Sequence, residues 1–196
     1  AFTAGEIENA RLALRIGPEE LAEAVIFARK GWVTLERGDI IRFGQYEQDG
    51  DRENGTEGID WIVLDTHDNE ALVISLYGLI TRNFNKNYSV PSWETSSIRE
   101  WLNETFFKTA FSEDERDAVL VTLLDNSEEQ SGKQEESEPG NDTEDRVFLL
   151  SYDEADRFFV SNEERVCKPT DEMIANKEGK LASGCRWWLR SVEGVR

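Results

Sequence analysis

The sequence predicts a fold that combines β-strands with helices and joins them through long irregular segments. Two apolar, β-branched runs, residues 59–64 and 70–77, are separated by a short polar stretch, which is typical of an antiparallel hairpin. Ser97, Ser112 and Ser151 are each followed three residues later by Glu, and this spacing is the capping-box pattern that begins a helix. Strand and helix signals therefore alternate along the same chain.

The first 37 residues predict a helical hairpin that precedes the main fold. Good helix formers and apolar residues over Glu6–Ile16 predict a first helix, which Gly17-Pro18 ends. Pro18–Lys30 predicts a second helix, since its apolar residues fall on one stripe. We therefore expect residues 1–37 to form an N-terminal helical segment, either attached to a preceding domain or covering the main one.

The chain acquires β character from Asp39 onward. Residues 39–44 predict a short strand, and residues 47–58 an acidic loop. Residues 78–92 are irregular, polar and aromatic. Residues 125–145 are acidic and of low complexity, which predicts a disordered surface loop. A calcium loop is the alternative there, although the ligand spacing of an EF-hand is missing.

The segment Gly184–Ser191 concentrates tryptophan and arginine in a chain whose net charge is -19. On a strand, Trp187 and Trp188 point to opposite faces, whereas Arg186 and Arg190 share one face. The pair could be a core plug whose arginines satisfy nearby carboxylates. Alternatively, it could be a recognition surface, because Trp and Arg dominate binding hot spots.

Composition narrows the classes of partner. The chain has 41 acidic and 22 basic residues, which makes nucleic acid and anionic membrane poor partners. No apolar run is long enough to cross a bilayer, so we expect no membrane insertion. The chain starts at Ala1 without a basic and apolar leader, so we expect no signal peptide here.

The two cysteines, Cys167 and Cys185, allow one intramolecular disulfide, and two buried free thiols are the alternative. The disulfide would favour an extracellular or cell-surface location, but the sequence leaves the compartment open. We expect neither a metal nor another cofactor, since His67 is the only histidine and there is no Cys-x-x-Cys motif.

A series of motifs in fixed order resembles an uncharacterised bacterial domain family, DUF6273. The resemblance covers residues 38–196 and leaves residues 1–37 outside. Its motifs are Phe43-Gly44-Gln45-Tyr46, Ile59–Asp65, Ala71–Ser75, Tyr77-Gly78-Leu79, Trp93–Asn103 with Phe106, Ala110-Phe111-Ser112, Gly140–Thr143, Val147–Ser151, Arg165-Val166-Cys167 and Trp187–Ser191.

The resemblance implies an α+β fold with a twisted antiparallel sheet, packed helices and long irregular loops. Members of this family are similar to the C-type-lectin-like fold of the formylglycine-generating enzyme and of variable ligand-binding proteins. Family members continue with further strands after the motif Trp187–Ser191, whereas this chain stops at Arg196. We therefore expect a domain that lacks the usual C-terminal strands.

By this resemblance, the function expected is a non-catalytic ligand-binding or protein-interaction module of a bacterial protein, with a carbohydrate or a peptide as ligand. The candidate ligand-binding residues are Tyr88, Trp93, Trp188 and Arg190. A structural domain without a ligand of its own is one alternative. A cysteine-dependent oxidoreductase like the formylglycine-generating enzyme is another, although no base stands near either cysteine in the sequence.

Overall fold

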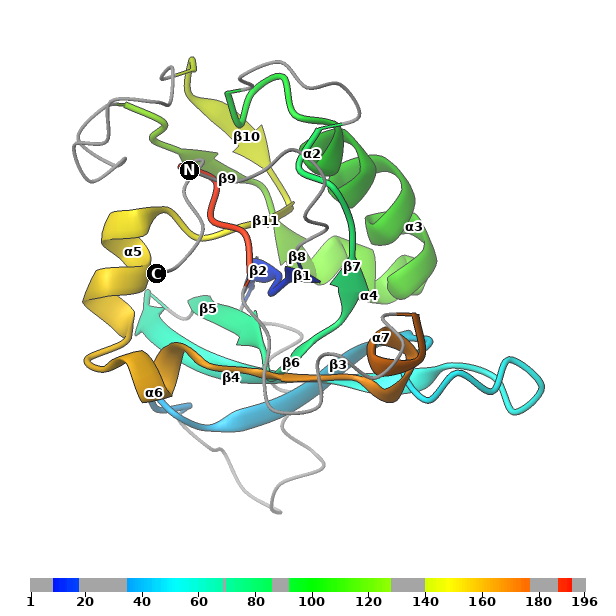
Figure 1. Ribbon diagram of the computed structural model, residues 1–196. Coiled ribbons are helices and arrows are strands. Elements are labelled where there is room, and N and C mark those ends of the chain that lie inside the picture. Colours follow the sequence, from blue (N-terminus) through cyan, green and yellow to red (C-terminus); the bar gives the residue numbers. More distant parts are fainter. Residues whose placement is uncertain are drawn as a thin grey trace.

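The computed structural model describes residues 9–17, 35–68, 70–85, 92–127, 140–176 and 187–191. Within these ranges the chain forms a twisted antiparallel sheet of six strands with helices around it (Figure 1). Its strands lie in the order β11 (Val147–Phe148), β2 (Ala13–Ile16), β5 (Glu70–Ser75), β4 (Glu57–His67) and β3 (Ile40–Tyr46), and β8 (Val119–Leu120) also pairs with β2. The predicted combination of an antiparallel sheet with helices is confirmed.

β4 and β5 form the hairpin that the sequence predicts, in antiparallel register. Along β4, Ile59, Trp61 and Val63 are fully buried, and the residues between them are half-buried, so one face of the strand packs on the core. On β5 all residues after Glu70 are buried, as expected of a strand that is covered on both faces.

The helix predicted over Glu6–Ile16 is wrong for the residues that the structure describes. Residues 9 and 10 form β1 (Asn9–Ala10), and residues 13–16 form β2, which pairs with β5, β8 and β11. Leu12, Leu14 and Ile16 have no exposed surface. Helix propensity is a weak preference, and here strand pairing with burial on both sides outweighs it. The second predicted helix lies outside the described residues.

Two helices begin at the predicted capping boxes, and a third begins one residue before the position that the sequence predicts. α2 (Ser97–Trp101), η2 (Leu102–Phe106) and α3 (Phe107–Ala110) form one continuous helix whose middle turn is π-helical, and α4 (Glu113–Ala118), α5 (Tyr152–Phe158), α6 (Asn162–Arg165) and α7 (Asp171–Asn176) follow. Ser112 and Ser151 close the predicted capping boxes. The cap of α2 is Ser96 rather than Ser97, since the Ser96 hydroxyl accepts the Arg99 N–H at 3.3 Å.

Short strand pairs lie beside the main sheet. β1 pairs with β7 (Ile80–Thr81), β9 (Thr122–Leu124) with β10 (Thr143–Asp145), and β6 (Tyr77–Gly78) with β12 (Lys168–Pro169), the last pair in parallel. β10 lies within the stretch 125–145 that was predicted to be disordered, so this prediction is wrong at the C-terminal end of the stretch. Residues 128–139 lie outside the described part.

The strand predicted over Gly184–Ser191 is reduced to a single bridging residue, Trp187, within its described part. The chain then turns at Arg190, whose backbone N–H donates to Leu150 O at 2.9 Å. This backbone hydrogen bond and the side-chain hydrogen bonds of Trp187, Trp188 and Arg190, rather than a longer strand ladder, hold the segment in place. Across the ranges described, no helix combines the length and the apolar run that a bilayer crossing needs.

Candidate ligand-binding pocket

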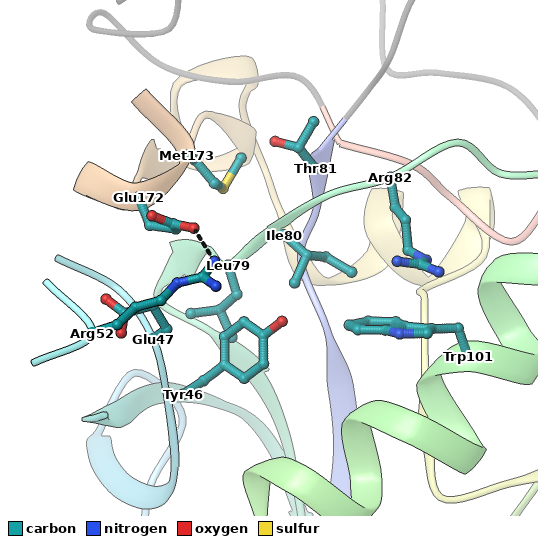
Figure 2. A pocket seen from close by; sticks show the side chains of 10 residues that line it. All are labelled: Tyr46, Glu47, Arg52, Leu79, Ile80, Thr81, Arg82, Trp101, Glu172 and Met173. Carbon is teal, nitrogen blue, oxygen red and sulfur yellow. Dashed lines mark hydrogen bonds and ion pairs between the residues drawn. The ribbon is translucent and has the colours of Figure 1, made fainter. Parts of the chain in front are cut away.

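A hollow of about 240 Å³ lies where β3, β7, α7 and the end of α2 come together (Figure 2). We call it the Tyr46–Trp101 pocket. Parallel pairing of β6 with β12 brings α7, the next element after β12, beside β7. The pocket is lined by Tyr46, Glu47, Arg52, Leu79, Ile80, Thr81, Arg82, Trp101, Glu172 and Met173.

Tyr46 reaches the pocket because of a β-bulge in β3. The register with β4 shifts within β3, so that one extra residue lies opposite β4. Side chains alternate along a strand, and the extra residue therefore places Tyr46 on the same face as the buried Ile41 and Phe43. Gly44 lies in the bulge and has a φ of 72°, a conformation that favours glycine.

The ring of Tyr46 packs against an aromatic neighbour, and its hydroxyl group faces the pocket. Its ring packs on Phe106, with the ring centroids 5.1 Å apart. Burial raises the pKa of the Tyr46 phenol above its usual value; Arg82 lowers it, and Glu172 raises it further. The phenol therefore feels charged groups of both signs across the pocket, and it stays protonated at neutral pH.

Arg82 forms the positive end of the pocket. Its guanidinium lies 4.4 Å from the centre of the Trp101 ring, a cation–π contact, and Figure 2 shows it above that ring. Among the residues that the structure describes, no carboxylate and no carbonyl accepts a hydrogen bond from this guanidinium. Since an arginine carries five N–H donors, Arg82 presents donor groups to the pocket for which the described part of the chain supplies no acceptor.

The opposite side of the pocket is acidic. Glu172 on α7 lies 3.4 Å from Arg52, whose side chain is 80% exposed. Glu47 lies beside it, and the carboxylate oxygens of Glu47, Asp49 and Glu57 lie within 4.8 Å of one another. Four acids and one exposed arginine thus make this end negative. Figure 2 shows Glu172 and Arg82 on opposite sides of the pocket.

Three of these acids, Glu47, Asp49 and Glu57, have oxygen atoms close enough together to ligate a hard cation. Backbone N–H groups already bind all three carboxylates, however: Gly50 donates to Glu47 at 2.8 Å, Asp51 to Asp49 at 2.7 Å and Gln48 to Glu57 at 2.7 Å. We therefore assign no metal site to this loop.

Trp188, a candidate ligand-binding residue, lies behind the pocket rather than in it. Its indole N–H donates to the backbone carbonyl of Arg82 at 3.0 Å. Its ring meets Phe84 edge-on, with the centroids 5.6 Å apart, and Trp93 packs on the same Phe84 at 6.2 Å. Both tryptophans thus support the segment that carries Arg82.

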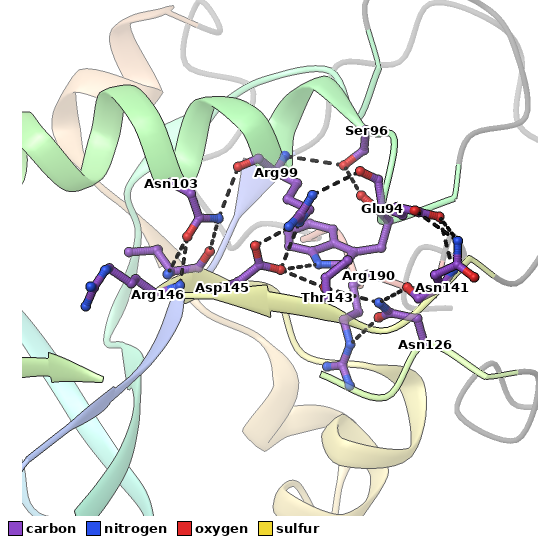
Figure 3. Close-up of polar contacts among 12 residues, drawn as sticks. Glu94, Ser96, Arg99, Asn103, Asn126, Asn141, Thr143, Asp145, Arg146 and Arg190 are labelled. Carbon is purple, nitrogen blue, oxygen red and sulfur yellow. Dashed lines mark hydrogen bonds and ion pairs between the residues drawn. The ribbon is translucent and has the colours of Figure 1, made fainter. Parts of the chain in front are cut away.

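Trp93 is 2% exposed and belongs to a polar network (Figure 3). Asp145 on β10 accepts hydrogen bonds from the Trp93 indole at 2.9 Å, from Arg99 Nε at 2.8 Å and from the Thr143 hydroxyl at 2.8 Å. A buried carboxylate with three donors is well satisfied. The network joins α2 to β10 and offers no free indole face to a ligand.

Arg190, 3% exposed, is bound in a similar way. Its guanidinium donates to the Glu154 carboxylate, to Leu149 O at 3.2 Å and to Asn126 Oδ1 at 3.2 Å. It lines a second hollow of about 300 Å³, to which Asp125 contributes. Glu154 neutralises this arginine, and Arg190 therefore differs from Arg82 in the Tyr46–Trp101 pocket.

Of the three remaining predicted residues, the structure describes only Cys167. Tyr88 and Cys185 lie outside the described residues. Cys167 is buried, with 3% of its surface exposed, and the predicted disulfide stays a prediction because its other member, Cys185, is not described. The ligand-binding predictions also stay untested, but Trp93 and Arg190 are buried, and of the described candidates only Trp188 is half-exposed.

The residues that line the pocket carry only weak sequence signals. Trp101 falls at helical spacing with Ile98 and Leu102, which predicts a core position, and it is in fact half-buried at the pocket wall. Gly44 inside a strand pattern is the typical signal of a bulge, and this signal could have pointed to Tyr46.

Comparison with protein families gives one match. A family model described as a domain of unknown function, DUF6273, matches residues 68–196. The chain belongs to the DUF6273 family. The match begins at residue 68, so it includes Arg82, Trp101 and Glu172 of the pocket, whereas Tyr46 on β3 precedes the matched DUF6273 region. Neither the curated proteins nor the solved structures gave a match.

Proposed function

We propose that this DUF6273 protein is a non-catalytic module that binds a small polar ligand, or the end of a larger one, in the Tyr46–Trp101 pocket. The observation that carries the proposal is Arg82, a guanidinium stacked on Trp101 whose donors at the pocket have no acceptor in the described part of the chain. Arg82 is half-buried at the pocket, so an acceptor group of a ligand can take the place of the water that these donors meet there.

The size of the pocket limits what it can enclose. Ligand pockets for drug-sized molecules measure about 300–1,000 Å³, and this one, at about 240 Å³, lies below that range. Since a water occupies about 30 Å³ in the liquid, the pocket encloses a ligand or ligand part of roughly eight to ten heavy atoms. A free small molecule or the terminus of a chain fits this volume.

The pocket walls favour a peptide-like ligand over a carbohydrate. Sugars bind by stacking on open aromatic faces, but Arg82 covers one face of Trp101, and Phe106 packs close to the same ring at 5.7 Å. The charged groups Arg82, Glu47 and Glu172 instead suit the charged groups of amino acids and peptides. The bacterial origin and the lectin-like fold belong to this proposal and are supported by the motif resemblance alone.

The test is a screen of the 196-residue chain on a glycan array and on an array of short peptides. Arg82→Gln removes the guanidinium charge, and Arg116→Gln on α4, away from the pocket, is the matched control. We expect binding to survive Arg116→Gln and to be lost with Arg82→Gln. Binding that survives both variants would place the site elsewhere, and the absence of binding to either array would favour a structural domain.

A further inference from the structure

The Tyr46–Trp101 pocket has two ends of opposite charge, which narrows the class of ligand further. Arg82 stands on one side, and Glu172 and Glu47 stand on the other (Figure 2). Apolar Ile80 and Leu79 lie between these ends. A ligand with one charge would therefore satisfy only one side of the pocket.

We infer that the ligand is a short zwitterionic peptide, of about two residues, whose terminal carboxylate binds Arg82 and whose terminal ammonium binds at Glu172 and Glu47. This inference rests on the function proposed above. A free α-amino acid carries both charges on one carbon, so it cannot reach two opposite walls. Two extended residues span about 7 Å, which is the order of the width of a cavity of this volume.

The carboxylate end follows from the geometry of Arg82. A guanidinium presents its N–H groups as a planar fork that matches both oxygens of a carboxylate. Stacking on Trp101 fixes the plane of the fork, and the Trp188 indole fixes the backbone behind it at 3.0 Å. An arginine that is held in this way loses little further side-chain entropy on binding.

The ammonium end follows from the excess of negative charge around Glu172. Its partner, Arg52, is 80% exposed, and an ion pair of this kind contributes little, so a ligand ammonium can compete for the carboxylate. Glu47, Asp49 and Glu57 add negative potential nearby. The Tyr46 hydroxyl lies between the two charged ends and can donate to or accept from the peptide group in the middle of such a ligand.

The experiment measures the affinity of the full chain for alanyl-alanine by isothermal titration calorimetry. The same peptide with an acetylated N-terminus lacks the ammonium, and the same peptide with a C-terminal amide lacks the carboxylate. We expect each blocked peptide to bind about 10- to 100-fold more weakly, the range that a charge-assisted hydrogen bond represents.

Variants assign each effect to its residue. In Arg82→Gln, the free and the amidated peptide should bind equally, whereas Glu172→Gln should remove the preference for the free N-terminus. Arg82→Lys keeps the charge and loses the fork, so it should retain part of the preference, and it serves as a second variant if Arg82→Gln is misfolded by circular dichroism. Arg116→Gln should leave all three affinities unchanged.

Three results would overturn the inference. If a blocked peptide binds as tightly as the free one, the blocked terminus makes no contact that contributes to affinity. An Arg82→Gln variant that weakens the free and the amidated peptide by the same factor removes the carboxylate contact. Pocket-dependent binding to glycans without any dipeptide binding would overturn this inference and leave the proposed binding function standing, whereas no binding in any assay would overturn both.

Discussion

Replacing Asp145 by alanine should destabilise the fold strongly. The Asp145 side chain is 1% exposed and accepts hydrogen bonds from Trp93, Arg99 and Thr143 (Figure 3). In the Asp145→Ala variant the Trp93 indole N–H loses its acceptor in a buried position. The Arg99 guanidinium also loses its carboxylate, and these two losses set the size of the effect.

The magnitude follows from the burial of the partners. Removing one member of a buried ion pair costs about 3–5 kcal/mol. The Arg99 side chain is 26% exposed and can regain some water, so we expect the lower end, about 3 kcal/mol. For a chain of this size, each kcal/mol lowers Tm by about 2–4 °C, which gives a Tm decrease of roughly 6–12 °C. Asp145→Asn keeps one acceptor oxygen and should cost about half as much.

Urea denaturation followed by tryptophan fluorescence measures the free energy of unfolding, and calorimetry measures Tm. The matched control is Glu104→Gln, which breaks the exposed pair between Glu104 and Lys108 (2.6 Å) and should leave both quantities unchanged within error. If Asp145→Ala unfolds at the same urea concentration as Glu104→Gln, Asp145 contributes no more than a surface charge and the reasoning is refuted.

Three further predictions concern the sheet, the bulge and one acid. A chain that begins at residue 38 lacks β2, so β5 and β11 lose their neighbour, and we expect no cooperative thermal transition by circular dichroism. Gly44→Ala places a Cβ 2.6 Å from an aromatic ring at positive φ and should cost about 2 kcal/mol in urea denaturation. Asn141→Ala should raise the pKa of Glu94 toward its usual value, as followed by NMR titration, because the Asn141 amide holds that pKa low.

Each of these predictions has a result that contradicts it. A cooperative transition in the shortened chain would show that β2 is dispensable. Gly38 also has a positive φ but has open space around it, so Gly38→Ala measures the cost of backbone strain alone. An equal loss of stability in both variants would show that the contact with the aromatic ring contributes nothing. Because the pKa of Glu94 is lowered in the fold, its stabilisation is present at neutral pH and is lost as pH falls through that pKa. An unchanged pKa in Asn141→Ala would contradict the assigned cause.

The sequence predicts those parts of the fold that depend on neighbouring residues. The β4–β5 hairpin and the helices capped by Ser112 and Ser151 were found because a turn or a cap is formed within a few residues. The strand β2 was missed because its residues, such as Leu14, are good helix formers, and only pairing with strands far along the chain makes them extended. That pairing leaves no local signal.

The same distinction explains the site. The sequence points to Trp93 and Trp188 as candidate binding residues, but it does not show that both lie outside the lining of the pocket. Tyr46, Arg82 and Glu172 come from three distant segments, and they meet only through the bulge in β3 and the parallel pairing of β6 with β12. No spacing rule relates three such positions.

The support behind Arg82 connects the stability of the fold to the proposed binding. Trp93 donates a hydrogen bond to Asp145 and packs on Phe84. Trp188 packs on the same Phe84 ring and donates a hydrogen bond to the backbone carbonyl of Arg82. A change at Asp145 can therefore reach Arg82 through packed rings, without any contact with a ligand. It follows that loss of binding in an Asp145 variant is no evidence for a site at Asp145, and that only variants at the pocket surface, with the fold shown to be intact, can assign the ligand contacts.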